Sequence, residues 1–226
     1  MSVANAAGMT LPAGSAVDPA ADPAAAHGAA HHQDYEGDKT GMWLFLFTEF
    51  ALFAALFVIY GVYRIIYTPE FHHAAANLNV AAGVTNTVIL LTSSLTMVLA
   101  VNALQRGENR RSMALLWATM ALALAFMVIK YFEWGAKFEH GLYPGSEHLL
   151  AMDGGEIVFF GLYFVMTGLH GIHVLLGVGA MLFLLPRIKS GRQSATNYTL
   201  TENVGLYWHL VDVIWIFLLP LFYLTN

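Results

Sequence analysis

Five long apolar stretches, separated by short polar segments, follow one another after residue 39. Three of them contain no charged residue, between residues 71 and 105, 112 and 129, and 157 and 186. The first and the last stretch each enclose one charge, Glu49 and Asp212. A helix that crosses a bilayer needs about 20 mainly apolar residues. The pattern therefore predicts five membrane-spanning helices, over residues 42–66, 80–104, 113–135, 156–185 and 203–224.

The composition agrees with an all-α, polytopic membrane protein that folds as a five-helix bundle. Of the 226 residues, 58% are hydrophobic and 11% are charged, whereas a soluble domain carries about 25% charged residues. The net charge of −5 is spread without a basic run, which argues against nucleic acid as a partner. The absence of cysteine leaves His, carboxylates and Met as ligands for any metal.

Residues 1–39 differ from the rest of the chain. They are rich in Ala, Gly, Pro and Asp, contain His27, His31 and His32, and lack the basic leader and apolar run of a signal peptide. We expect a disordered or tethered N-terminal arm, followed by a transmembrane domain over residues 40–226. The three His are candidate metal ligands, but without a scaffold they fix no geometry, so we favour a solvated arm.

The basic residues of the loops predict the orientation of the bundle. One side of the membrane has Lys39 and the basic loops at 106–111 and 187–192, whereas the other side has Arg64 and Lys137. Because basic loops are enriched on the cytoplasmic side, we expect the N-terminus in the cytoplasm and the C-terminus outside.

Glu49 lies about two turns inside the first predicted helix, among phenylalanine residues. A charged carboxylate at this depth is unfavourable, so an intramembrane carboxyl group is a functional candidate by default. Two interpretations have equal weight at this point. Glu49 is either a reactive protonatable group or a neutral carboxyl that only bonds a neighbouring helix.

Two further polar pairs lie inside apolar stretches. His170 and His173, and likewise His209 and Asp212, are three residues apart and therefore share a helix face. Haem ligation, copper ligation and a proton relay are the functional interpretations, and an interhelix hydrogen-bond network is the structural one. We favour the network, because a core with two haems and a copper would need about six inward-facing His. No metal site and no catalytic residue is expected in this chain.

Glu133 is a further candidate member of this polar network. It follows Lys130 by three residues near the end of the third predicted helix, so the two side chains are expected to pair with each other at the membrane interface. A proton entry point is the functional alternative, and an anchor for the helix end is the interpretation that we favour.

Five segments, in this order along the chain, resemble subunit III of haem-copper terminal oxidases. The resemblance covers residues 41–223. Its most specific segments are Thr167-Gly-Leu-His170-Gly-Ile-His173-Val and Tyr207-Trp-His209-Leu-Val-Asp212-Val-Ile-Trp215, and the others contain Phe47-Thr-Glu49-Phe, Thr85-Asn86 and Lys130-Tyr-Phe-Glu133-Trp. The five predicted helices match the short form of the family, as in bo-type quinol oxidases, which lacks the first two helices of the seven-helix form.

The resemblance implies an accessory role in aerobic respiration and electron transport. Subunit III packs mainly against subunit I of a complex that also contains subunit II, and it supports proton uptake and stability of an oxidase that reduces O₂ to water and pumps protons. It holds no redox centre, so haem and copper belong to the partner subunit, while membrane phospholipid is a candidate ligand. Glu49 matches the family's carbodiimide-reactive carboxylate, whose suggested roles concern lipid binding and proton uptake. The location implied is the bacterial cytoplasmic (inner) membrane.

Two alternative functions are kept. The accessory membrane subunit of some nitric oxide reductases has the same five-helix plan and the same two late motifs. A stand-alone proton or solute pathway through Glu49, His170, His173 and Asp212 is less favoured, because the sequence contains no internal repeat, broken helix or charged pore ring.

Overall fold

The structure is a computed structural model that describes residues 23–224. The chain divides into two units, Met1–Asp38 and Lys39–Asn226, and the second unit contains all the side-chain contacts described below. The predicted arm, residues 1–39, lies largely outside the described residues, and its last part belongs to the first helix.

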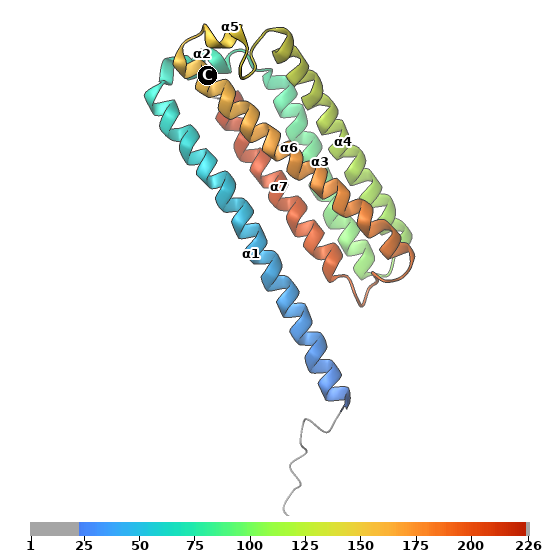
Figure 1. Cartoon of the computed structure of the whole chain (residues 1–226). Coiled ribbons are helices and arrows are strands. Elements are labelled where there is room, and N and C mark those ends of the chain that lie inside the picture. Colours follow the sequence, from blue (N-terminus) through green and yellow to red (C-terminus); the bar gives the residue numbers. More distant parts are fainter. Residues whose placement is uncertain (1–22, 225–226) are drawn as a thin grey trace, which may run out of the picture. The chain divides into compact units, whose positions relative to one another are not determined.

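Seven helices make up the described part of the chain, in which no residue forms a β-strand. Two of them, α2 and α5, are short connectors (Figure 1). The bounds are α1 Pro23–Ile66, α2 Thr68–Ala75, α3 Val80–Gln105, α4 Asn109–Glu139, α5 Glu147–Leu150, α6 Gly154–Lys189 and α7 Thr199–Tyr223.

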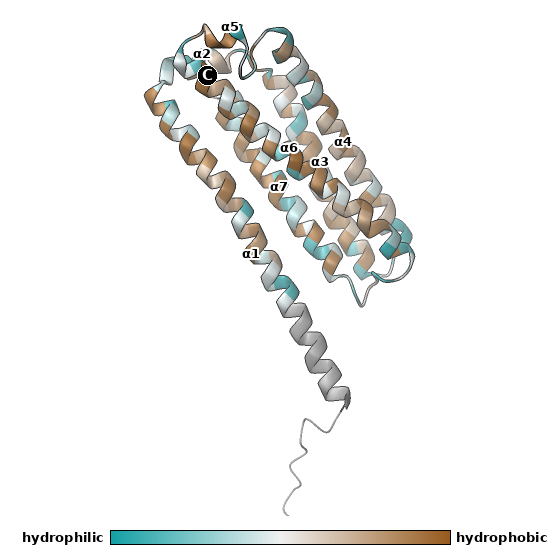
Figure 2. Ribbon diagram, in the orientation of Figure 1, coloured by the Kyte–Doolittle hydropathy of each residue, from teal (hydrophilic) through white to brown (hydrophobic). Residues whose placement is uncertain are grey.

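The prediction of five membrane-spanning helices is confirmed. The segments long and apolar enough to cross a bilayer are Gly37–Ile66, Val80–Gln105, Asn109–Glu139, Gly154–Lys189 and Thr199–Tyr223. Figure 2 shows hydrophobic residues along these helices and hydrophilic residues gathered towards their ends. Helix α6 continues through Pro186, where the sequence predicts its end, because a proline in the last turn removes one backbone hydrogen bond without displacing the residues after it.

Helices α3, α4, α6 and α7 pack against one another as a bundle. The hairpin of α3 and α4 turns at Gly107, whose φ of 77° lies in the left-handed region that glycine adopts readily. Hydroxyl groups hold the two helices together: Thr96 Oγ1 lies 2.8 Å from Thr119 Oγ1, and the Ser112 hydroxyl donates to the Ala100 carbonyl at 2.8 Å. In an apolar solvent, such small polar residues permit close helix contact and satisfy each other.

Two fully buried tryptophans of α7 lock this helix onto α3. Trp208 Nε1 donates to Ser93 Oγ and Trp215 Nε1 donates to Thr87 Oγ1, both at 3.1 Å. Each indole therefore combines a large apolar contact with a satisfied donor, as a buried tryptophan requires.

Little of the membrane-spanning part of α1 is buried. Its contacts with the bundle are a few aromatic and polar side chains: the Tyr60 hydroxyl donates to the Leu221 carbonyl, the ring of Tyr60 lies 5.0 Å from that of Phe222, and Phe53 meets the His173 ring edge-on at 5.3 Å. Side chains rather than close backbone packing therefore join α1 to α6 and α7.

Replacing Gly177 of α6 with alanine is expected to destabilise the bundle by about 1–3 kcal/mol. An added Cβ would lie 2.7 Å from ring atoms of Trp208, which the Ser93 bond holds in place. The matched control is Gly179→Ala on the same helix, where a Cβ meets nothing within 4 Å. Thermal unfolding in detergent should separate the two variants, and equal midpoints would contradict the packing described for Trp208.

Candidate functional site

Glu49 of α1 and His173 of α6 form a hydrogen-bonded pair inside the membrane-spanning region. Glu49 Oε2 lies 2.8 Å from His173 Nε2, and both side chains are largely shielded from solvent. The Tyr207 hydroxyl donates to the His173 backbone carbonyl at 3.1 Å, and Phe53 covers the imidazole edge. A contact between α1 and α6 thus depends on two ionisable groups 124 residues apart.

The geometry of this pair requires a shared proton. His173 Nδ1 lies 2.8 Å from the Leu169 carbonyl, and because a carbonyl only accepts, Nδ1 must carry a hydrogen. If the imidazole is neutral, Nε2 is then an acceptor and Glu49 must be the donor; if Nε2 is protonated, Glu49 is the carboxylate. In either form one proton lies between the two side chains.

A second buried cluster joins α4, α6 and α7 through Lys130, Glu133, Tyr163 and Tyr223. Lys130 Nζ donates to Glu133 Oε2 at 3.1 Å, to the Tyr163 hydroxyl at 3.1 Å and to the Tyr223 hydroxyl at 3.0 Å. Both tyrosine hydroxyls also contact Glu133 Oε1, at 2.9 and 2.5 Å. We call these four residues the Lys130–Glu133 cluster.

All three hydrogens of the Lys130 ammonium and both oxygens of Glu133 have partners in this cluster. Burial of an ion pair is tolerated only when such additional hydrogen bonds replace water. The aromatic rings of Tyr163, Trp215 and Tyr223 lie 4.9–5.6 Å from the ammonium nitrogen and contribute cation–π attraction. These hydrogen bonds and cation–π contacts therefore stabilise the two charges inside the bundle.

The remaining candidate residues occupy separate places. His209 Nδ1 lies 2.8 Å from the Ser94 hydroxyl, which connects α7 to α3, and Asp212 is buried beside the same serine. His170 is fully buried between the rings of Phe126 and Trp215, and neither of its nitrogens has a hydrogen-bond partner among the described residues.

The polar residues singled out from the sequence are thus distributed over several contacts rather than joined in one chain of hydrogen bonds. Glu49 meets His173, Glu133 meets Lys130, and His209 meets Ser94. Lys130 and Glu133 pair as expected, and both side chains are buried within the bundle, where two tyrosines complete their hydrogen bonds.

Sequence reasoning missed Tyr163, Tyr223 and Ser94. A signal existed for Tyr163, which lies within the charge-free part of α6, because a tyrosine buried at that depth needs a partner for its hydroxyl. Tyr223 and Ser94 have no comparable signal, since aromatic residues near helix ends and single serines are common in membrane helices.

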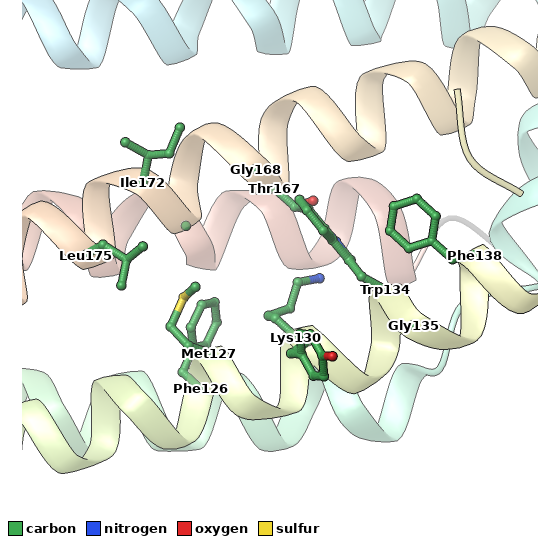
Figure 3. Close-up of a pocket in the computed structure, with 12 residues that line it drawn as sticks. Phe126, Met127, Lys130, Trp134, Gly135, Phe138, Thr167, Gly168, Ile172 and Leu175 are labelled. Atoms are coloured by element: carbon green, nitrogen blue, oxygen red, sulfur yellow. The ribbon is translucent and has the colours of Figure 1, made fainter. Parts of the chain in front are cut away.

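A groove of about 450 Å³ lies between α4 and α6, above Lys130. In Figure 3 the Lys130 side chain extends from α4 towards α6, and Trp134 lies across from Thr167 and Gly168. The walls are almost entirely apolar, with Phe126, Met127, Tyr131, Phe138, Ile172 and Leu175 among the lining residues. Since the Lys130 ammonium is already fully hydrogen-bonded, the groove offers hydrocarbon contact rather than a polar anchor.

In the described part of the chain, no group of three or more His, Cys, Asp or Glu side chains is arranged to hold a metal ion. Two of the three intramembrane histidines are engaged by other groups: His173 through both ring nitrogens, and His209 through Nδ1 to Ser94.

Comparison with known proteins places these motifs in a family. The family model described as cytochrome c oxidase subunit III matches residues 19–226. The chain belongs to the cytochrome c oxidase subunit III family. The resemblance inferred from the sequence motifs is thereby confirmed, and with its five apolar helices this member is a multi-pass membrane protein.

Relatives of this subunit III family member include proteins of both cytochrome c and quinol oxidases. It is 32% identical over 186 residues to cytochrome c oxidase subunit 3 of Alkalihalophilus pseudofirmus, which covers 82% of this chain and 85% of the relative. It is 29% identical over 203 residues to cytochrome bo(3) ubiquinol oxidase subunit 3 of Pseudomonas aeruginosa, covering 86% and 89%.

A third relative is a longer chain. The haem-copper oxidase subunit I+III of Aeropyrum pernix is 31% identical over 205 residues, which cover 86% of this chain but 24% of the relative. The chain therefore spans about a quarter of that protein, whose name joins subunits I and III.

Proposed function

We propose that this chain is the accessory subunit III of a haem-copper respiratory terminal oxidase in the cytoplasmic membrane of a bacterium. Its main partner is subunit I, with subunit II in the same complex, and its N-terminus faces the cytoplasm. The chain supports proton uptake and stability of an enzyme that reduces O₂ to water. The observation that carries the proposal is the family match over residues 19–226.

The name of the Aeropyrum relative supports subunit I as the partner. A single chain called subunit I+III requires the two parts to be made together and to lie in one membrane. In the proposal the same two parts are separate polypeptides that associate through helix packing in the bilayer.

The role assigned to Glu49 is proton exchange near the partner's uptake path or contact with lipid, and not a redox step. Its bond to His173 supports the proton role, because either side chain can hold the shared proton while the hydrogen bond persists. The family's haem and copper do not fit the residues present. His170 is enclosed by Phe126 and Trp215, and both nitrogens of His173 are engaged. No step is therefore assigned to a metal on this chain.

Purification through an affinity tag in mild detergent tests the proposal. We expect oxidase subunits I and II among the co-purified proteins, and haem absorption that follows the catalytic subunit and leaves this chain when the complex is dissociated. A haem band that stays with the isolated chain would contradict the accessory role. If nitric oxide reductase subunits co-purify instead, the result would support the alternative function, an accessory membrane subunit of a nitric oxide reductase.

A further inference from the structure

A groove that combines an apolar lining with a few polar side chains opens on the outer side of α3 and α7. It has a volume of about 200 Å³ and is lined by Asn102, Gln105, Glu202 and His209 together with Val98, Val101, Gly205 and Leu206. We call these eight residues the α3–α7 face. His209 lies seven residues after Glu202, so it is about 10 Å deeper in the membrane at 1.5 Å per residue.

His209 makes this face unsuited to lipid. The side chain is half-buried, and its Nδ1 is engaged by Ser94, whereas no hydrogen bond of Nε2 is found among the described residues. A polar group that faces hydrocarbon without a partner is unfavourable by several kcal/mol. A surrounding that can hydrogen-bond to the imidazole is therefore required at this depth.

The charge of the groove specifies the kind of partner. Glu202, its only carboxylate, lies 2.9 Å from Lys39 Nζ of α1, so the acidic group is already compensated within the chain. The remaining polar side chains are an amide at Asn102, an amide at Gln105 and the imidazole. The complementary surface is thus one with neutral hydrogen-bonding side chains such as amides and hydroxyls, and not one with a net charge.

Helices α3 and α7 also expose apolar side chains, such as Leu95 and Phe217, so it is His209 that distinguishes this side from the opposite side of the bundle. The large exposed side chains of α4 and α6 in the membrane are apolar, for example Trp117, Leu124, Val128, Ile172 and Leu175. The groove between these helices is also apolar, as Figure 3 shows. Acyl chains can cover this surface without leaving a hydrogen-bonding group unsatisfied.

We infer that the α3–α7 face is where a transmembrane helix of another oxidase subunit docks, with a hydrogen-bonding side chain opposite His209, while the α4–α6 side faces lipid. The inference rests on the proposed function, because the partner is a subunit of that complex. It adds the surface of contact and the chemistry of the partner helix, a segment with neutral polar residues at the depth of His209.

A photo-crosslinking pair tests the inference in the assembled complex. Val98 on the α3–α7 face and Val128 on α4 are both valines with similar exposure, 47% and 53%. A benzophenone amino acid is incorporated at position 98 in one variant and at position 128 in another, and membranes are irradiated before solubilisation. We expect a protein crosslink to another oxidase subunit from position 98 and lipid adducts from position 128.

A protein crosslink from position 128 alone, equal protein crosslinking from both positions, or lipid adducts alone from position 98 would each overturn the inference. Failure of the proposed function is distinguishable, because then no oxidase subunit co-purifies with the unmodified chain. A second matched pair of variants measures association with the partner subunit. Val98→Trp should reduce co-purification of the partner about tenfold, because the larger side chain overpacks the interface. Val128→Trp should leave co-purification unchanged. An equal effect of the two substitutions would also overturn the inference.

Discussion

Replacing Glu133 with alanine is expected to lower the free energy of unfolding by about 3–5 kcal/mol, the usual effect of removing one partner of a buried ion pair. The substitution leaves the Lys130 ammonium without its carboxylate and deprives the hydroxyls of Tyr163 and Tyr223 of their acceptor. Because the Lys130–Glu133 cluster joins α4, α6 and α7, the loss should affect the whole bundle. Thermal unfolding of the purified protein in detergent measures it.

Two comparisons isolate the buried pair from a general effect of charge removal. Glu139→Ala changes an exposed glutamate at the end of the same helix and should shift the midpoint little. The double variant Lys130→Met with Glu133→Leu removes both charges and should recover much of the lost stability, because apolar replacements of a buried pair are often tolerated. A Glu133→Ala midpoint equal to that of Glu139→Ala would contradict the cluster.

Replacing Glu49 with glutamine is expected to leave assembly intact and to make the oxidase lose activity several-fold faster during turnover. A glutamine amide still hydrogen-bonds to His173 Nε2, so the contact between α1 and α6 is retained. The amide cannot release a proton, so residue 49 and His173 can no longer exchange a proton with their surroundings. Carbodiimide labelling of this position, followed by mass spectrometry, should disappear at the same time.

The matched control is Glu108→Gln, which alters a surface carboxylate paired with Arg111 in the loop between α3 and α4. It should inactivate at the rate of the unchanged protein. An oxidase that is inactive from its first turnover after Glu49→Gln would contradict an accessory role, because it would make Glu49 part of the reaction itself.

The helices could be predicted from the sequence because the bilayer imposes a minimum apolar length on each crossing. The contacts between the helices could not be predicted as directly. A spacing of three residues shows that His170 and His173 share a face, but it does not say which helix that face meets. In the structure His173 reaches α1, a helix at the other end of the chain, and His170 is enclosed by Phe126 and Trp215.

The surroundings of Lys130 show a second limit to what can be predicted from the sequence. The pair with Glu133 is local and follows from helix geometry, whereas its burial depends on tyrosines 33 and 93 residues later in the chain. Hydrogen bonds to residues far along the chain leave no periodic pattern in the sequence, so a buried ion pair and a solvent-exposed one can have the same local sequence. The difference between them arises only from how α6 and α7 approach α4.

The few contacts of α1 with the other helices have a consequence for biosynthesis. His173, the partner of Glu49, lies 124 residues after it, and Leu221, whose carbonyl accepts from Tyr60, lies 161 residues after that tyrosine. At about 5–20 residues per second, the ribosome needs roughly 6–25 s after Glu49 to reach His173. During this time α6 and α7 have not yet been completed. The contacts of Glu49 and Tyr60 with α6 and α7 can therefore form only at the end of synthesis, and until then Glu49 has to be hydrated or protonated.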